Sequence, residues 1–181
     1  FLDHRDTRQM IRERAQDKSF LNLYAYTGSF TVYAAAGGAR RSVTVDMSKT
    51  YQDWARRNLA HNGLDDSDRH SFVQSDVAAF LQRMRTDRTR FDLILLDPPS
   101  FSNSKRMHST FDVQRDQLAL ISATLDLLAP GGTLYFSNNR QGFKLDPGVQ
   151  ELASVTEISQ RTIPRDFKRR TPHRCWEMHR A

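Results

Sequence analysis

Cysteine is almost absent from this chain, which carries Cys175 alone among 181 residues, so no intrachain disulfide can form. This suits a reducing compartment, and we expect a cytoplasmic protein. Long apolar runs are missing too, since none approaches the ~20 residues that span a bilayer, and we expect no membrane contact. The first residues, FLDHRDTRQMIRER, lack an initiator Met and the apolar core of a signal peptide. We therefore expect a fragment of a longer protein.

The glycine-rich loops that hold phosphates are also missing. A dinucleotide site needs G-x-G-x-x-G, but the turn after the first expected strand, Tyr26-Thr27-Gly28-Ser29-Phe30, has one glycine. Nothing matches the P-loop pattern G-x-x-x-x-G-K-[ST] either. These absences argue against a dinucleotide-dependent oxidoreductase and against a P-loop phosphate site.

Positive charge, in contrast, is abundant. Lys and Arg number 27 against 21 acidic residues, and they cluster at 12–18, 83–90 and 165–174. The planar fork of arginine suits phosphate, so the clusters predict a polyanion partner, with Arg169 and Arg170 as candidate contacts. The alternative is ordinary solvated surface charge.

Strand and helix patterns alternate along the chain. Apolar runs predict strands at 20–26, 42–46, 70–76, 91–97, 133–139, 156–163 and 174–181. Helices are predicted at 30–38, 49–63, 77–84 and 112–129, the last closed by Pro130-Gly131-Gly132. Alternation implies βαβ units, so we expect one α/β domain over residues 1–181 with a doubly wound, mainly parallel sheet of seven strands.

Small and polar residues follow the first five predicted strands in succession. They are Thr27-Gly28-Ser29, Asp46, Asp76, Asp97-Pro98-Pro99 and Ser137-Asn138-Asn139. In doubly wound sheets, ligands bind beyond the carboxyl ends of the strands. The sequence therefore predicts a binding site at this edge of the sheet.

The two acidic residues fit a nucleoside. Asp46 lies 18 residues after Gly28, near the spacing at which a carboxylate accepts from the two ribose hydroxyls. Asp76 is placed to accept from an exocyclic amine such as that of adenine. For both residues the alternative is a helix cap. A nucleoside without a pyrophosphate matches S-adenosylmethionine (SAM), the common cofactor of this kind.

The stretch FDLILLDPPSFSNSKRM follows an apolar strand with a rigid turn. Proline fixes φ and extends the residue before it, so Asp97-Pro98-Pro99 exposes a carboxylate and carbonyls beside a flat proline surface. A planar base can stack there, with Phe101 as a second platform. Lys105 and Arg106 are candidate contacts to flanking phosphates.

These motifs resemble a known family. FLNLYAYTGSF, TVDMSKTYQDWARRNLAHNGL, FVQSD and FDLILLDPPSF are similar, in order, to the cofactor and substrate motifs of class I SAM-dependent RNA methyltransferases. With FLDHRDTR, FDVQRDQLALI and FSNNRQGF, they resemble the C-terminal half of bifunctional 23S ribosomal RNA guanine methyltransferases over essentially the whole chain. That resemblance implies methylation of nitrogen 7 of a guanine in large-subunit ribosomal RNA. It also implies a Rossmann-like sheet whose last strand is antiparallel, and a fused N-terminal methyltransferase half.

The resemblance also implies roles for individual residues. Asp3 and Arg5 would lie near the amino-acid end of the cofactor, and residues 26–30 would line its methionine portion. The adenosine would be held by Asp46, Met47, Ser48, Asp76 and Val77. Asp97 is our candidate for stabilising the cationic product base, and Asn138 and Asn139 are candidates for reading the guanine edge, with buried structural amides as the alternative.

A missing thiol separates this chain from relatives that methylate carbon 5 of cytosine. Those relatives carry a nucleophilic cysteine after the fifth strand, where this chain reads Ser137-Asn138-Asn139. His173, Cys175 and His179 have spacings that put all three on one face of a strand, but strand packing explains them better than metal, so we expect no metal. A different RNA position, a protein or small-molecule substrate, and an inactive RNA-binding module stay open as alternatives.

Overall fold

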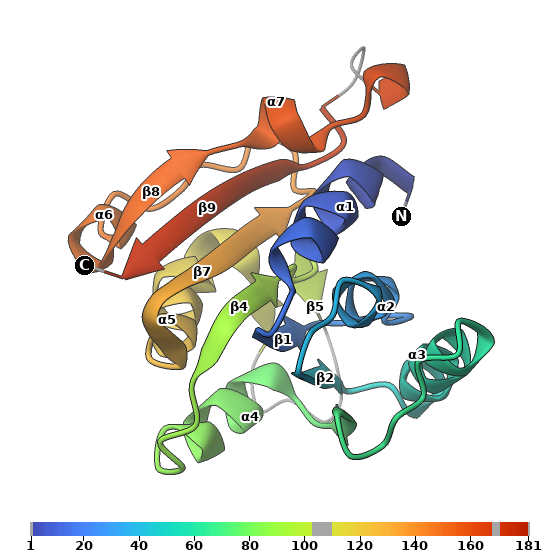
Figure 1. The fold of residues 1–181 in the computed structure, drawn as a ribbon. Helices are drawn as coiled ribbons and strands as arrows, with labels where there is room; N and C mark the ends of the chain where they lie inside the picture. Colours follow the sequence, from blue (N-terminus) through green and yellow to red (C-terminus); the bar gives the residue numbers. More distant parts are fainter. Residues whose placement is uncertain (1, 103–109, 168–170, 181) are drawn as a thin grey trace.

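The computed structural model describes residues 2–102, 110–167 and 171–180. Its main sheet has seven strands in the order β3-β2-β1-β4-β7-β9-β8 (Figure 1). Their bounds are β1 Ser19–Leu23, β2 Arg41–Asp46, β3 His70–Gln74, β4 Phe91–Leu96, β7 Leu128–Asn138, β8 Ala153–Glu157 and β9 Arg174–Arg180. The first five strands in this order pair in parallel, and β9 pairs antiparallel with both of its neighbours, β7 and β8. The predicted fold class is confirmed.

Helices cover both faces of the sheet. On one face lie α1 (Arg5–Arg14), α2 (Ser29–Ala36) and α3 (Lys49–His61), and on the other α4 (Val77–Met84) and α5 (Val113–Leu125) (Figure 1). The shorter elements are η1 Leu2–His4, β5 Phe101–Ser102, β6 Phe111–Asp112, α6 Val149–Leu152, α7 Ser159–Thr162 and η2 Arg165–Phe167. Within the described residues, every helix is too short or too polar to cross a bilayer.

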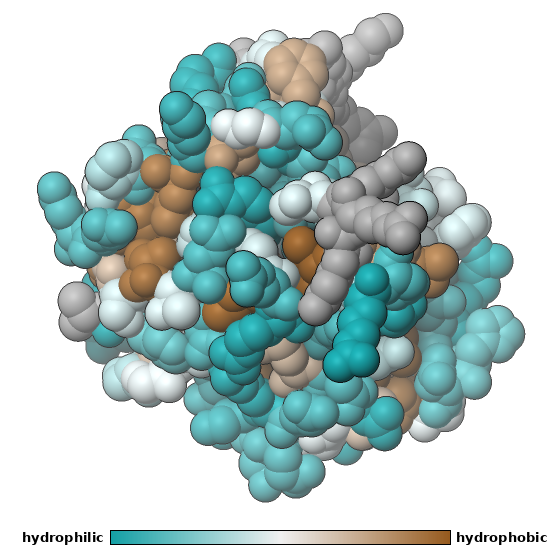
Figure 2. Space-filling model, turned by 90° about the horizontal axis from the view of Figure 1, so that it is seen from above, coloured by the Kyte–Doolittle hydropathy of each residue, from teal (hydrophilic) through white to brown (hydrophobic). Residues whose placement is uncertain are grey.

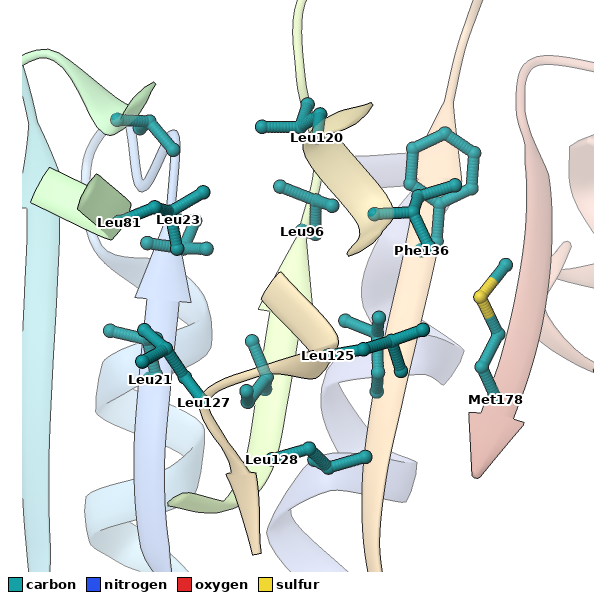
Figure 3. Close-up of a cluster of buried hydrophobic side chains, with 14 of the residues drawn as sticks. Leu21, Leu23, Leu81, Leu96, Leu120, Leu125, Leu127, Leu128, Phe136 and Met178 are labelled. Atoms are coloured by element: carbon teal, nitrogen blue, oxygen red, sulfur yellow. The ribbon is translucent and has the colours of Figure 1, made fainter. Parts of the chain in front are cut away.

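The central strands are apolar because both of their faces are covered. All five residues of β1 and five of the six of β4 are buried, as expected of inner parallel strands. Figure 3 shows the core beneath α4 and α5, where Leu21, Leu23 and Leu96 face Leu120 and Leu125. A second core packs Phe20, Leu93, Leu95 and Tyr135 against Ile11, Phe30 and Ala34 of α1 and α2.

The strand order reverses between β1 and β4. From β1 the chain moves outward through β2 to β3, and then returns to the other side of β1 for β4. The loops that follow β1 and β4 therefore diverge, which leaves a crevice at their carboxyl ends. The fold itself defines where a ligand can enter.

Several predicted boundaries were wrong. The first strand ends at Leu23 rather than residue 26, because Tyr24 and Tyr26 adopt positive φ (57° and 51°) as the chain turns toward α2. The strand predicted at 156–163 is β8, which ends at Glu157, and a helical turn follows it. Here the buried hydroxyls of Ser159 and Thr162 hydrogen-bond within the turn and to the segment before β9.

The glycine turn predicted after the fourth long helix lies inside a strand instead. Helix α5 ends at Leu125, not at residue 129, and β7 already begins at Leu128. The pairing with β4 shifts register across Pro130-Gly131-Gly132, so these residues form a bulge. A Cβ at Gly132 would lie 2.9 Å from the carbonyl oxygen of Asp92, so glycine permits the close approach.

Helix α1 is an element that the sequence did not signal. Its segment, RDTRQMIRER, is mostly charged, and only Thr7, Arg8 and Ile11 are buried. Its position depends on α2, where a Cβ at Gly37 would lie 2.1 Å from the carbonyl oxygen of Arg12. The two helices therefore approach backbone to backbone.

We expect Gly37→Ala to lower the free energy of unfolding by about 3 kcal/mol, because the new methyl group meets the backbone of α1, which cannot rotate away. Gly63→Ala is the control: its φ is +65° but it has no other atom within 4 Å of a Cβ, so only backbone strain of about 1 kcal/mol applies. Urea unfolding followed by circular dichroism measures both. Equal losses would show that α1 does not approach α2 this closely.

Candidate active site

A cavity of about 670 Å³ opens at the carboxyl edge of the sheet. Figure 2 shows the molecule from above. Apolar residues form patches within a mainly hydrophilic face. Residues from the ends of β1 to β4, from the loop after β7 and from the N-terminal turn line it. The predicted residues among them are Asp3, Tyr26, Ser29, Phe30, Asp46, Met47, Ser48, Asp76, Val77, Asp97, Pro98, Pro99, Phe101 and Asn139.

Asp46 is fixed by the backbone on both sides. One carboxylate oxygen accepts from the amide of Tyr26 at 2.8 Å, and the other accepts from the amide of Ser48 at 2.8 Å. Burial raises the pKa of Asp46, although these backbone hydrogen bonds oppose the shift. Asp46 is not the cap of α3, because Ser48 is the N-cap and accepts from the amide of Tyr51. A half-buried, oriented carboxylate in a cavity is suited to accept hydrogen bonds from paired hydroxyls.

Asp76 is a helix cap, as the alternative from the sequence stated, and it also faces the cavity. Its carboxylate accepts from the amide of Ala79 at 3.0 Å and caps α4, and the residue also lines the cavity. Met47 and Val77 add apolar surface beside it. Together they form a polar edge with an apolar floor, which suits a planar heterocycle with an exocyclic amine.

The Asp97-Pro98-Pro99 turn forms another wall of the cavity. Ser137 donates to Asp97 at 2.6 Å, and Ser100 donates to the side-chain oxygen of Asn139 at 2.8 Å. These two bonds join the loops after β4 and β7. Phe101 is 52% exposed, although it belongs to β5, so an aromatic face is open at this end of the cavity.

Around Asp3, three further residues that line the cavity were missed: His4 in the N-terminal turn, Arg8 in α1 and Asn22 in β1. His4 and Arg8 are buried and line the cavity, as does Asn22, which is 1% exposed. Asn22 donates to Thr31 at 3.0 Å, while its side-chain oxygen has no hydrogen-bond partner. A buried acceptor without a donor is costly unless a ligand or water supplies one. The signal in the sequence was a lone asparagine inside an apolar strand.

The structure does not bring every predicted residue to the cavity. Arg5 pairs with Asp166 at the surface, 3.0 Å for one of its two bonds, and Thr27 accepts from Asn58 through its carbonyl. Gly28 serves packing, since a Cβ there would lie 2.5 Å from that of Ala55.

Asn138 is buried and its side-chain oxygen accepts from the amide of Arg140, in agreement with the structural alternative. Lys105, Arg106, Arg169 and Arg170 lie outside the described residues.

The histidines do not make the arrangement considered from the sequence. Cys175 is buried in β9 and His179 contacts Gly132 and Glu177. His173 instead lies within 4.8 Å of Asp3 and His4, a grouping that could hold a metal. Both of its ring nitrogens, however, already have protein partners, Asp3 and Thr162. Asp3, His173 and Thr162 therefore form a hydrogen-bonded chain.

The fold and the site are those of a class I methyltransferase, and comparison with known proteins agrees. The family model for S-adenosylmethionine-dependent methyltransferases matches residues 1–172. The chain therefore belongs to this family, whose cofactor is SAM.

Within the family, the chain is similar to the ribosomal RNA large subunit methyltransferases K and K/L. It is 54% identical to methyltransferase K of Neisseria meningitidis serogroup B, over 98% of this chain and 50% of the relative. It is 51% identical to methyltransferase K/L of Methylococcus capsulatus, over 98% of this chain and 24% of the relative.

The chain thus spans half the length of one curated relative and about a quarter of the other. A solved structure, that of the methyltransferase SMU.776 complexed with SAH, superimposes with a TM-score of 0.81 at 26% identity, over 98% of this chain and 49% of that one.

The residues present fit SAM. The cavity volume lies within the range of small-molecule sites. It offers two carboxylates for a nucleoside, an orphaned acceptor at Asn22, and Arg8 near a third carboxylate, Asp3. The cofactor would supply an activated methyl group, and the protein would hold its ends apart along the sheet.

We expect Asp46→Asn to weaken SAM binding by about tenfold or more, because an amide accepts at one atom where the carboxylate accepts at two. Binding of RNA should be unchanged. Asp92→Asn is the matched control, since Asp92 also accepts from a backbone amide, that of Ser19 at 2.7 Å, but does not line the cavity. Calorimetric titration with SAM measures the affinity of both variants. Equal losses of affinity would contradict a contact between Asp46 and the ribose.

Proposed function

We propose that this chain transfers the methyl group of SAM to nitrogen 7 of a guanine in 23S ribosomal RNA. Similarity to methyltransferases K and K/L over almost the whole chain supports large-subunit ribosomal RNA as the substrate. The observation that favours a ring nitrogen over a ring carbon is the absence of any reactive thiol at the cavity. In the full-length protein we propose a second, fused methyltransferase half.

The strand order supports one direction for the cofactor along the sheet. Asp76 follows β3 and Asp46 follows β2, so adenine and ribose would lie over these neighbouring strands. The amino-acid end would then lie beyond β1, beside Asp3 and Arg8. Between the two ends, the methyl group would face Asp97 at the end of β4.

The acceptor base would enter from the side of β4 and β7. Pro98, Pro99 and Phe101 offer flat surfaces there, and aromatic platforms are the usual means of holding unstacked bases. Tyr26 and Tyr51 also line the cavity and are partly exposed. Their rings are in edge-to-face contact, with centroids 4.5 Å apart. A base held against such surfaces can be aligned with the methyl group, and alignment is the main contribution that this reaction needs.

Nitrogen 7 carries an in-plane lone pair and loses no proton on methylation, so no general base is required. The base becomes cationic as the bond forms. Asp97 lines the cavity at the end of β4, and the hydroxyl of Ser137 donates to its carboxylate. Its negative charge, fixed before reaction, would stabilise the charge that develops on the base.

A pyrimidine carbon would need a thiolate to activate the ring. Cys175 is buried in β9 beside Ser137, and burial raises the pKa of its thiol, which disfavours the thiolate. It does not line the cavity.

The proposed function is tested by incubating unmodified, protein-free large-subunit ribosomal RNA with the chain and methyl-labelled SAM. We expect label at a single guanine, at which borohydride followed by aniline cleaves the strand, since a cationic purine ring opens readily. Label on an exocyclic amine or a pyrimidine resists this cleavage and would overturn the assignment to nitrogen 7. An absence of label in a chain that binds both SAM and RNA would overturn the proposed activity for this chain.

Because the thiol is not needed, Cys175→Ala should retain methylation within about threefold and lose only about 1 kcal/mol of stability through the small volume removed. A steady-state rate at a temperature well below the melting point measures the first, and urea unfolding the second. Loss of all activity in a folded Cys175→Ala variant would instead favour a cysteine-dependent mechanism.

A further inference from the structure

His173 is buried and fully engaged. It is 1% exposed, its Nδ1 lies 2.8 Å from a carboxylate oxygen of Asp3, and its Nε2 lies 3.0 Å from the hydroxyl of Thr162. Its ring stacks on that of His4 with centroids 3.8 Å apart and planes 17° from parallel. Such a ring has neither rotational freedom nor a free nitrogen.

The contact with His173 fixes Asp3, which lines the cavity. Burial opposes ionisation of Asp3, but the hydrogen bond from His173 and the two nearby imidazoles outweigh it, so the pKa of Asp3 lies below its usual value. The carboxylate is therefore ionised and held in one orientation.

The surroundings of Asp3 match an α-amino acid. Arg8, 8% exposed, lies beside the rings of Phe30 and Tyr33. Asn22, whose side-chain oxygen has no partner, lines the same cavity. An anion and an uncharged acceptor suit an ammonium group, and a guanidinium suits a carboxylate. In this cavity the three groups come from η1, α1 and β1.

We propose that His173 is a positioning residue for the amino-acid end of the cofactor, acting through Asp3. This rests on the cofactor direction given under the proposed function. His173 stands just before β9, and Thr162 ends α7. These two residues therefore support a site whose direct contacts come from the N-terminal turn.

The inference is tested by comparing two ligands. S-adenosylhomocysteine carries the amino-acid group, and 5′-methylthioadenosine lacks it but keeps the nucleoside. We expect His173→Ala to weaken S-adenosylhomocysteine about tenfold, as for a lost charge-assisted hydrogen bond, and to change 5′-methylthioadenosine less than about twofold. At saturating SAM, kcat should be retained while KM for SAM rises.

His70→Ala is the matched control. His70 is also buried and hydrogen-bonded to a hydroxyl, that of Ser42 at 2.9 Å, but does not line the cavity. It should leave the ratio of the two affinities unchanged.

His173→Asn keeps an N–H near the position of Nδ1 and should restore most of the lost affinity. Asp3→Asn should lower the same ratio, and its effect should not add to that of His173→Ala. An equal loss for both ligands in His173→Ala, or the absence of rescue in a folded His173→Asn, would reduce the residue to a packing role. These titrations require neither RNA nor turnover, so a failure of ribosomal RNA methylation leaves them interpretable.

Discussion

The site depends on the parallel pairing of β1 with both β2 and β4. Because these strands run in the same direction in the middle of the sheet, their carboxyl ends lie at one edge. Residues that are far apart in the chain, Asp46 and Asp97 among them, thereby line one cavity. The burial of β1 and β4 on both faces stabilises this pairing, so the same apolar side chains that form the core also fix the positions of the polar ones.

Polar contacts beneath the cavity set its finer geometry. Gln52, on α3, donates to the carbonyl oxygens of Thr44, Asp46 and Val73, and so joins this helix to the ends of β2 and β3. Between β2 and β1, the hydroxyls of Thr31 and Thr44 are 2.8 Å apart, and Asn22 donates to the hydroxyl of Thr31. Each of these buried groups limits the movement of a strand end. Asp46 is thus held by its neighbours before any ligand arrives, which reduces the entropy lost on binding.

Much of the fold and of the candidate site could be predicted, because local sequence patterns indicate helix ends and strand ends. Helix α4 has the predicted bounds, since an apolar period of 3.6 begins directly after a capping aspartate. The polar strand ends were visible because apolar runs precede them. Of the residues around Asp3, which only the family resemblance indicated, Arg8 and Asn22 could not be predicted: α1 is mostly charged, and Asn22 lies inside a strand rather than at its end. The contact between Asp3 and His173 joins positions 170 residues apart, a pairing that depends on where β9 inserts in the sheet.

That separation has a consequence for biosynthesis. Asp3 leaves the ribosome before every strand of this sheet, whereas His173 and β9 follow the other six strands. Strand β9 also lies between β7 and β8, so it completes the sheet by insertion rather than by addition at an edge. A nascent chain that contains the nucleoside-binding strands would still lack the support for Asp3. Full affinity for the methyl donor would then appear only after synthesis of this domain is complete, and a truncated product would bind the donor more weakly.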